Sequence, residues 1–238
     1  MDIIEALHTR RSIRQFKNTP IPEEVLNRVI ENALQSPSNS NSQPYRIAVA
    51  TGETCNEIRE ELTKKYQKAS VIQTKPLPIK ATQAVLQGVV PDGDFNPVIK
   101  YPPELQQRKF VCGMGLYETL GIDRKDKAAR ERQMLRNFEF FDAPAAIFMF
   151  INSKLDRYAA LDGGIFMQSL MLSALNEGLG TCAQGALAIW GGPVRKRFKV
   201  DKGYKLICGL SIGYPEDHAV NQYAPEKRTV DSVCLKIK

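Results

Sequence analysis

Side chains that bind metals are scarce in this sequence. Only two of its 238 residues are histidines, and its five cysteines, an odd number, include no CxxC pair. With no grouped carboxylates either, the chain lacks the ligand spacing of a zinc knuckle or a catalytic metal centre. The scattered cysteines also give no disulfide framework, which favours a reduced, cytoplasmic protein. We therefore expect chemistry that needs no metal.

Long apolar segments are missing as well. The first twelve residues include an acidic residue, Asp2, and lack the apolar stretch that forms the hydrophobic core of a signal peptide. The longest apolar run, residues 143–151, is about half of the 18 or more residues that a membrane span requires. We expect it to be a buried strand in a protein without a membrane partner.

The remaining composition is that of an ordinary globular protein. Hydrophobic residues make up 43% and charged residues 25% of the chain, which excludes disordered and fibrous classes and fits a single domain over residues 1–238. Lys and Arg outnumber Asp and Glu by 33 to 26, giving a net charge of +7. This surplus attracts anions, whether a cofactor phosphate, nucleic acid or anionic lipid.

Helical and strand patterns alternate along the chain. Short β-prone runs predict strands at 45–51, 145–150, 181–183 and 205–212. Amphipathic or helix-rich stretches predict helices after Asp2 and at 22–34, 53–68, 112–120, 124–141, 164–176 and 193–198. Few strands among many helices indicate the α+β class, with a small central mixed sheet surrounded by helices.

Two segments stand out from this pattern. Residues 70–110 hold six of the fourteen prolines, which predicts an ordered excursion or lid. Residues 164–176 are apolar on nearly all sides, so we expect this helix to be buried all round or against a second subunit.

Two short motifs imitate known catalytic or nucleotide signatures. Residues 209–213 spell GxSxG, but they lie in an apolar run followed by Pro215, so Ser211 is expected to be a strand residue and not an esterase nucleophile. Residues 178–183 spell GxGxxA, but they follow a helix, which predicts a helix-terminating turn.

A compact cationic cluster follows the first helix. Arg10, Arg11, Ser12 and Arg14 could bind a dianionic phosphate through charge-assisted hydrogen bonds. Taken alone, such a cluster is also typical of a solvated surface.

The cluster belongs to a larger set of segments. Residues 1–16 contain RRSIRQF and residues 36–52 contain PSNSNSQP, and residues 176–188 and 209–228 complete the set. Together they resemble the FMN-dependent nitroreductase family. The central segment 115–148 is similar to the subgroup of nitrobenzoate-type reductases.

This resemblance implies an intertwined α+β homodimer with FMN at the interface. Arg10 and Arg11 would then contact the FMN phosphate and ribityl end, Ser12 the flavin edge, and Arg14 the N1/C2 side of the ring. Arg14 would also stabilise the anionic reduced flavin.

Other segments would complete the same site. Arg228, with Lys227, would add a second phosphate contact, and Gln43 would support the loop that the other subunit contributes. The loop residues expected at the flavin are Pro37, Ser38, Asn39 and Asn41.

The resemblance also places residues along the flavin ring. Gln184, Gly185 and Ala186 match the segment whose backbone approaches N5, although some members carry glutamate at position 184. Asn137, beside Arg136, would meet the pyrimidine edge.

The function implied is electron-pair transfer from NAD(P)H to nitroaromatic or quinone acceptors by a ping-pong mechanism, with no dedicated catalytic side chain. Reductive dehalogenation and flavin fragmentation are alternatives on the same fold. Phe138, Phe140 and Phe141 either shape the acceptor side or pack in the core.

A different class of function is a nucleic-acid-binding module. It would use the arginine cluster together with Arg195, Lys196, Arg197 and Lys199. The exposed aromatic platforms or reading helix that such a module requires are not visible in the sequence.

Overall fold

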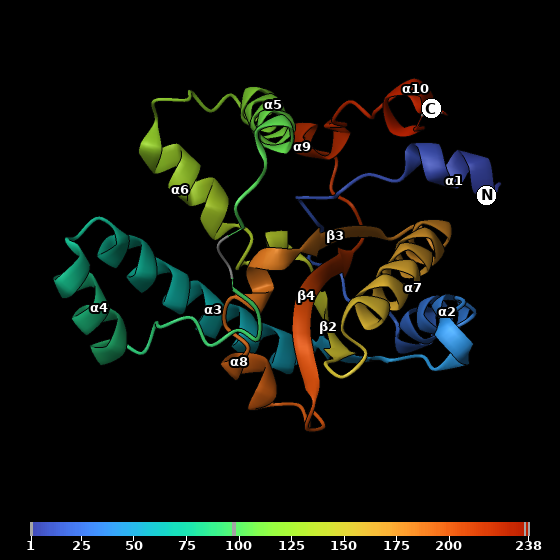
Figure 1. Ribbon diagram of the computed structural model, residues 1–238, viewed down its shortest axis with the longest axis horizontal. Helices are drawn as coiled ribbons and strands as arrows, with labels where there is room; N and C mark the ends of the chain where they lie inside the picture. Colours follow the sequence, from blue (N-terminus) through green and yellow to red (C-terminus); the bar gives the residue numbers. More distant parts are fainter. Residues whose placement is uncertain (1, 97–98, 236, 238) are drawn as a thin grey trace.

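The molecule is built around a small sheet. The computed structural model describes residues 2–96, 99–235 and 237, and its four strands lie side by side in the order β1-β2-β4-β3 (Figure 1). Their bounds are Tyr45–Thr51 (β1), Ala145–Asn152 (β2), Gly180–Gln184 (β3) and Tyr204–Gly213 (β4).

All three strand pairings are antiparallel, so the α+β class is confirmed while the expected mixed sheet is wrong. Strands β2 and β3 both pair with β4 and therefore run in the same direction, with α7 connecting them. A parallel bridge also joins Ser12, which lies outside the named strands, to Thr181 on β3.

Helices cover both faces of the sheet (Figure 1). Their bounds are Ile3–Thr9 (α1), Glu23–Ala33 (α2), Gly52–Gln73 (α3), Leu77–Leu86 (α4), Pro103–Thr119 (α5), Lys127–Leu135 (α6), Asp156–Asn176 (α7), Gly192–Arg195 (α8), Ala219–Gln222 (α9) and Val230–Val233 (α10). None of these helices combines the length and apolarity needed to cross a membrane.

Strand β2 separates two hydrophobic cores. Because successive side chains of a strand point to opposite faces, Phe148 packs in the core that includes α3 and α8. Ile147 packs in the other core, which α2 and α7 cover. Every residue of β2 except the last is buried, which explains why this strand reads as one continuous apolar run.

Helix α7 begins earlier than expected, at Asp156, and is not buried all round. Within the predicted segment 164–176, Phe166 and Leu170 lie in the core, whereas Ile165, Met167 and Met171 are only partly buried. Leu161, one turn earlier on α7, keeps 60% of its surface exposed. The helix is followed by Gly178 with φ of +74°, so the GxGxxA segment is a helix-terminating turn, as predicted.

The helix predicted over 124–141 ends at Leu135. Phe140 and Phe141 have φ values of +56° and +54°, which a continuing helix does not permit. Both rings and that of Phe138 are at most 1% exposed. The phenylalanines therefore pack in the core, and the turn that buries them interrupts the helix.

The proline-rich excursion contains helical segments where the structure describes it. It contains α4 and the start of α5, while residues 97 and 98 lie outside the described residues. Several hydrogen bonds connect it to the rest of the protein. Among them, the Trp190 indole N–H donates to the carbonyl of Val89, at 3.1 Å, and Asp94 accepts from Arg195 and from the Leu206 amide.

Candidate functional site

Five of the predicted FMN-binding residues, Arg10, Arg11, Ser12, Arg14 and Lys227, line one cavity. The chain leaves α1 at Arg10 in an extended conformation, and the Ile13 amide donates to the carbonyl of Thr181 on β3, at 2.9 Å. The segment after α1 therefore crosses the sheet edge with its cationic side chains beside the C-terminal segment. The resulting cavity, of about 280 Å³, is lined by Leu7, His8, Arg10, Arg11, Ser12, Arg14, Tyr223, Ala224, Pro225 and Lys227.

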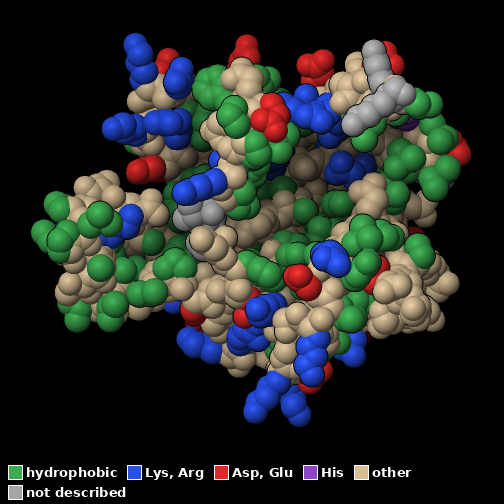
Figure 2. All heavy atoms as spheres, viewed as in Figure 1, with side chains coloured by type: hydrophobic (Ala, Val, Ile, Leu, Met, Phe, Trp, Pro, Cys, Tyr) green, Lys and Arg blue, Asp and Glu red, His purple; other side chains and the backbone are tan. Residues whose placement is uncertain are grey.

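The positive charge of this arginine cavity is not compensated. No ion pair involves Arg10, Arg11, Arg14 or Lys227 in the described part of the chain. Figure 2 shows Lys and Arg side chains where the N-terminal and C-terminal segments of Figure 1 come together. Lys227 lines the cavity, whereas Arg228 is exposed and is not among the lining residues. The donor set fits a phosphate dianion.

Asn221, which the sequence analysis did not identify, holds this cavity together. Its buried side-chain oxygen accepts from the amides of Arg14 and Gln15, at 2.7 and 3.2 Å. Its amide group donates to the carbonyls of Gln15 and Glu216, at 2.8 and 2.9 Å. One side chain therefore binds the N-terminal segment to the C-terminal one, and it lies inside the segment 209–228 that carries the family resemblance.

Burial keeps the cysteine beneath the arginines neutral. The Cys182 side chain is 4% exposed, and this burial raises the pKa of its thiol to about 11, although the charges of Arg14 and Arg10 act in the opposite direction. The thiol is therefore not an activated nucleophile at neutral pH.

The end of β3 offers an approachable backbone. A Cβ placed on Gly185 would meet no protein atom within 4 Å, so a flat ring can lie against this stretch of chain. The second residue of β3 is Thr181, which contacts Ser12, and the last is Gln184. One short strand therefore joins the arginine cavity to Gly185, over roughly 10–13 Å.

The Gln184 side chain is fixed by buried hydrogen bonds. Its oxygen accepts from the Ser211 hydroxyl, and its amide group donates to the carbonyl of Asn137, at 2.8 Å. Gln184 and Ser211 are 4% and 0% exposed. Ser211 is thus a buried strand residue, as predicted, and the Gln184 side chain holds Asn137 at the end of β3.

Arg136, the neighbour of Asn137, is fully engaged elsewhere. Its guanidinium binds Asp142 at 2.8 Å, Glu139 at 2.9 Å and the side-chain oxygen of Gln15 at 2.9 Å. Burial opposes its charge, but the hydrogen bonds to Asp142 and Glu139 raise the pKa of Arg136 above its ordinary value. Of these two residues, only Asn137 contacts the β3 end.

We expect the neutral amide of Gln184, which both donates and accepts, to be essential for stability. Gln184→Glu would set a carboxylate oxygen against the carbonyl of Asn137, and should lower the free energy of unfolding by about 2–3 kcal/mol at neutral pH. Ser211→Ala, which leaves the Gln184 oxygen without a donor, should cost about 1–2 kcal/mol. Denaturant titration measures both changes.

The loss in Gln184→Glu should shrink toward pH 4, where a protonated carboxyl group can again donate to Asn137. Gln87→Glu, at the exposed residue that directly follows α4, is the matched control and should leave stability within about 0.5 kcal/mol. A Gln184→Glu protein as stable as the wild type at neutral pH would contradict this assignment.

The loop of residues 37–41 lies apart from the arginine cavity. None of its residues lines that cavity, and Pro37, Asn39 and Asn41 are exposed. Ser40, Asn41 and Gln43 have φ values of +53°, +52° and +45°, a conformation that is uncommon outside glycine.

Side chains hold this strained loop in place. The buried carboxylate of Asp162 on α7 accepts from the Asn39 amide, at 3.2 Å. The Gln43 amide donates to the Ser38 hydroxyl and its side chain donates to Asn41, both at 3.0 Å. Gln43 therefore supports the loop, as predicted, and Asp162 is a second support that the sequence did not reveal.

The basic segment at 195–199 is not a free cationic patch. Arg195 pairs with Asp94, and Arg197 and Lys196 both pair with Glu61. Groups of three or more residues that could hold a metal ion do not occur among the described residues.

Comparisons with known proteins agree with this geometry. A model described as the Nitroreductase family matches residues 7–214. A 4-nitrobenzoate reductase of Pseudomonas putida is 32% identical over 92% of this chain and 87% of its own length.

Solved structures show the same architecture. An FMN and NADPH-dependent nitroreductase NfnB from sphigopyxis sp. strain HMH superposes with a TM-score of 0.85 at 27% identity, over the whole of both chains. The FMN-dependent nitroreductase NfnB from Mycobacterium smegmatis in complex with NADPH gives a TM-score of 0.80 at 27% identity, again over both whole chains.

Proposed function

The chain belongs to the Nitroreductase family, and from this premise we propose that it is an FMN-dependent oxidoreductase that passes electron pairs from NAD(P)H to nitroaromatic acceptors. The observation that carries the proposal is the arginine cavity, with its uncompensated cations, joined by β3 to the approachable backbone at Gly185. When bound, FMN supplies the two-electron chemistry.

The residues of the chain have distinct tasks in this proposal. Arg10, Arg11 and Lys227 bind the phosphate, since they line the cavity and form no ion pairs with other described residues. Arg14, fixed through its backbone by Asn221, holds a positive charge close to the ring and favours its anionic reduced form. Asn137 meets the pyrimidine edge, next to the Gly185 backbone.

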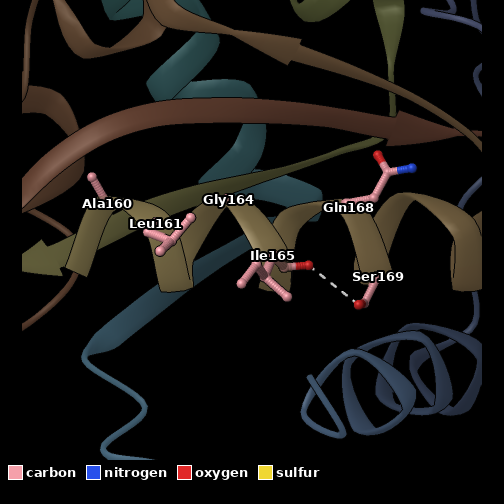
Figure 3. Close-up of a pocket in the computed structure, with 6 residues that line it drawn as sticks. All are labelled: Ala160, Leu161, Gly164, Ile165, Gln168 and Ser169. Atoms are coloured by element: carbon pink, nitrogen blue, oxygen red, sulfur yellow. Dashed lines mark hydrogen bonds between the residues drawn. The ribbon is translucent and has the colours of Figure 1, made fainter. Parts of the chain in front are cut away.

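We further propose a homodimer in which each loop of residues 37–41 completes the site of the other subunit. Leu161 and Ile165 lie side by side along a surface hollow of about 470 Å³ on α7 (Figure 3). Exposed apolar surface of this kind is typical of an interface. The loop sits beside the same helix, through Asp162, but does not reach the arginine cavity of its own chain.

All five cysteines are free thiols, which supports action in the cytoplasm. Quinones belong to the proposed acceptors as well, because a flavin donates electrons to any planar electron-poor acceptor that can lie over the ring.

Steady-state kinetics test the mechanism. We expect parallel double-reciprocal lines when NADPH and 4-nitrobenzoate or a quinone are varied together, because both substrates would use one ring face in turn. NADPH alone should bleach the flavin absorbance. Intersecting lines without bleaching would refute the ping-pong order, and a protein unable to bind FMN would refute the function itself.

A further inference from the structure

A second cationic cavity lies outside the site described above. It occupies about 430 Å³ between α3, α5 and α6, and Figure 1 shows α6 between the other two helices. Its lining residues are Tyr66, Ser70, Gln73, Thr74, Tyr117, Lys127, Arg130, Glu131 and Met134. We call it the Lys127 cavity.

The cations of this cavity lack partners. Lys127 and Arg130 are three residues apart on α6, so they share one face of the helix. Within the described residues neither forms an ion pair, and the Nε atom of Arg130 is buried without a hydrogen-bond partner. A buried guanidinium N–H without an acceptor is costly. The only acidic residue of the lining is Glu131.

Two phenols add further donors. Burial, together with Glu131 and Tyr117, raises the pKa of Tyr66, so its hydroxyl stays protonated at neutral pH. The hydroxyls of Ser70 and Thr74 are already used, since they donate to backbone carbonyls of α3. The donors that remain in the cavity are therefore two cations, two phenols and the side-chain amide of Gln73.

The Lys127 cavity and the β3 end share one turn of chain. The side-chain amide of Asn137 donates to the carbonyl of Met134, at 3.2 Å, and Met134 lines the cavity. The Tyr66 ring stacks on Phe138 with 4.7 Å between ring centroids. One turn of chain therefore separates the wall of the Lys127 cavity from the residue that Gln184 binds at the end of β3.

We propose that the Lys127 cavity binds a phosphate monoester, the 2′-phosphate of NADPH, and so selects NADPH over NADH. A phosphate monoester dianion has three terminal oxygens, which match two cations and two phenols better than a carboxylate does. Met134 and the tyrosine rings provide walls for an adenine, and the volume lies in the range of small-molecule sites, about 300–1,000 Å³. This inference rests on the proposed function.

Coenzyme preference is the first test. Arg130→Gln should lower the ratio of kcat/KM for NADPH to that for NADH by about tenfold or more, the effect of losing one hydrogen bond to a charged group. Arg132→Gln removes the same charge from the exposed side of the same helix and should leave the ratio unchanged. An equal loss with both coenzymes, or the same change in both variants, would overturn the inference.

Direct binding separates this inference from the proposed function. By calorimetry on the full chain, adenosine 2′,5′-bisphosphate should bind more tightly than AMP, and Arg130→Gln should abolish the difference. That result stands even if the protein proves to lack FMN or reductase activity. Inorganic phosphate that binds as tightly as the bisphosphate, or equal binding of AMP, would overturn the proposed ligand.

Discussion

Arg10→Ala is expected to weaken FMN binding by about 1.5–3 kcal/mol, or roughly tenfold to 150-fold in the dissociation constant. Arg10 lines the arginine cavity and forms no ion pair with any described residue, so its charge is available to the phosphate. The measurement is titration of the apoprotein with FMN, followed by the quenching of flavin fluorescence.

Arg28→Ala provides the control for charge alone. Arg28 lies on α2, is half exposed and pairs with Glu177, so its removal also lowers the net charge by one but should leave FMN affinity within about twofold. If Arg10→Ala bound FMN as tightly as Arg28→Ala, the arginine cavity would be a solvated surface and not the phosphate site.

Double substitution of Leu161 and Ile165 by aspartate is expected to yield FMN-free monomers. A twofold interface repeats each change, so four apolar side chains are lost, each contributing about 1.5–3 kcal/mol when fully buried. The dissociation constant of the dimer should therefore rise more than about a thousandfold. Separated chains would also lose the neighbouring loop of residues 37–41. Sedimentation velocity, recorded at protein and flavin wavelengths, reports both effects.

Val85→Asp tests whether any exposed apolar residue behaves in this way. Val85 lies on α4 and is 68% exposed, yet it is far along the chain from the proposed interface, so this variant should remain a yellow dimer. A wild-type protein that sediments as a monomer with FMN bound would disprove the shared site.

Structural elements that depend on residues close together in the sequence could be predicted from the sequence. The strand at Tyr45–Thr51 has its expected bounds because β-prone residues end at a glycine. The arginine cluster was found because its members are neighbours in the chain. Sequence spacing alone does not connect this cluster with residues 184–186. The family resemblance does, because it assigns both segments to the same FMN site.

Elements with a distant cause could not be predicted. The helical pattern continues past Leu135, but the chain adopts positive φ where three phenylalanines are buried. The free energy gained by burying these rings is available only when the sheet is in place. Asn221 lies 207 residues from the Arg14 amide that it binds. Asp162 could not be predicted either, because this carboxylate lies on an apolar helix and its partner, the backbone amide of Asn39, is distant in the sequence.

The Asn221 contact also determines when the arginine cavity can form during synthesis. The N-terminal segment cannot make its native contacts until most of the chain has been synthesised, because its partners are Thr181, Pro215 and Asn221. Closing so long a loop carries a high entropic cost, which slows this step of folding. The three arginines are neighbours in the chain from the start, but the cavity around them is completed only once Asn221 and Lys227 have been synthesised, so a chain truncated before these residues does not form the cavity.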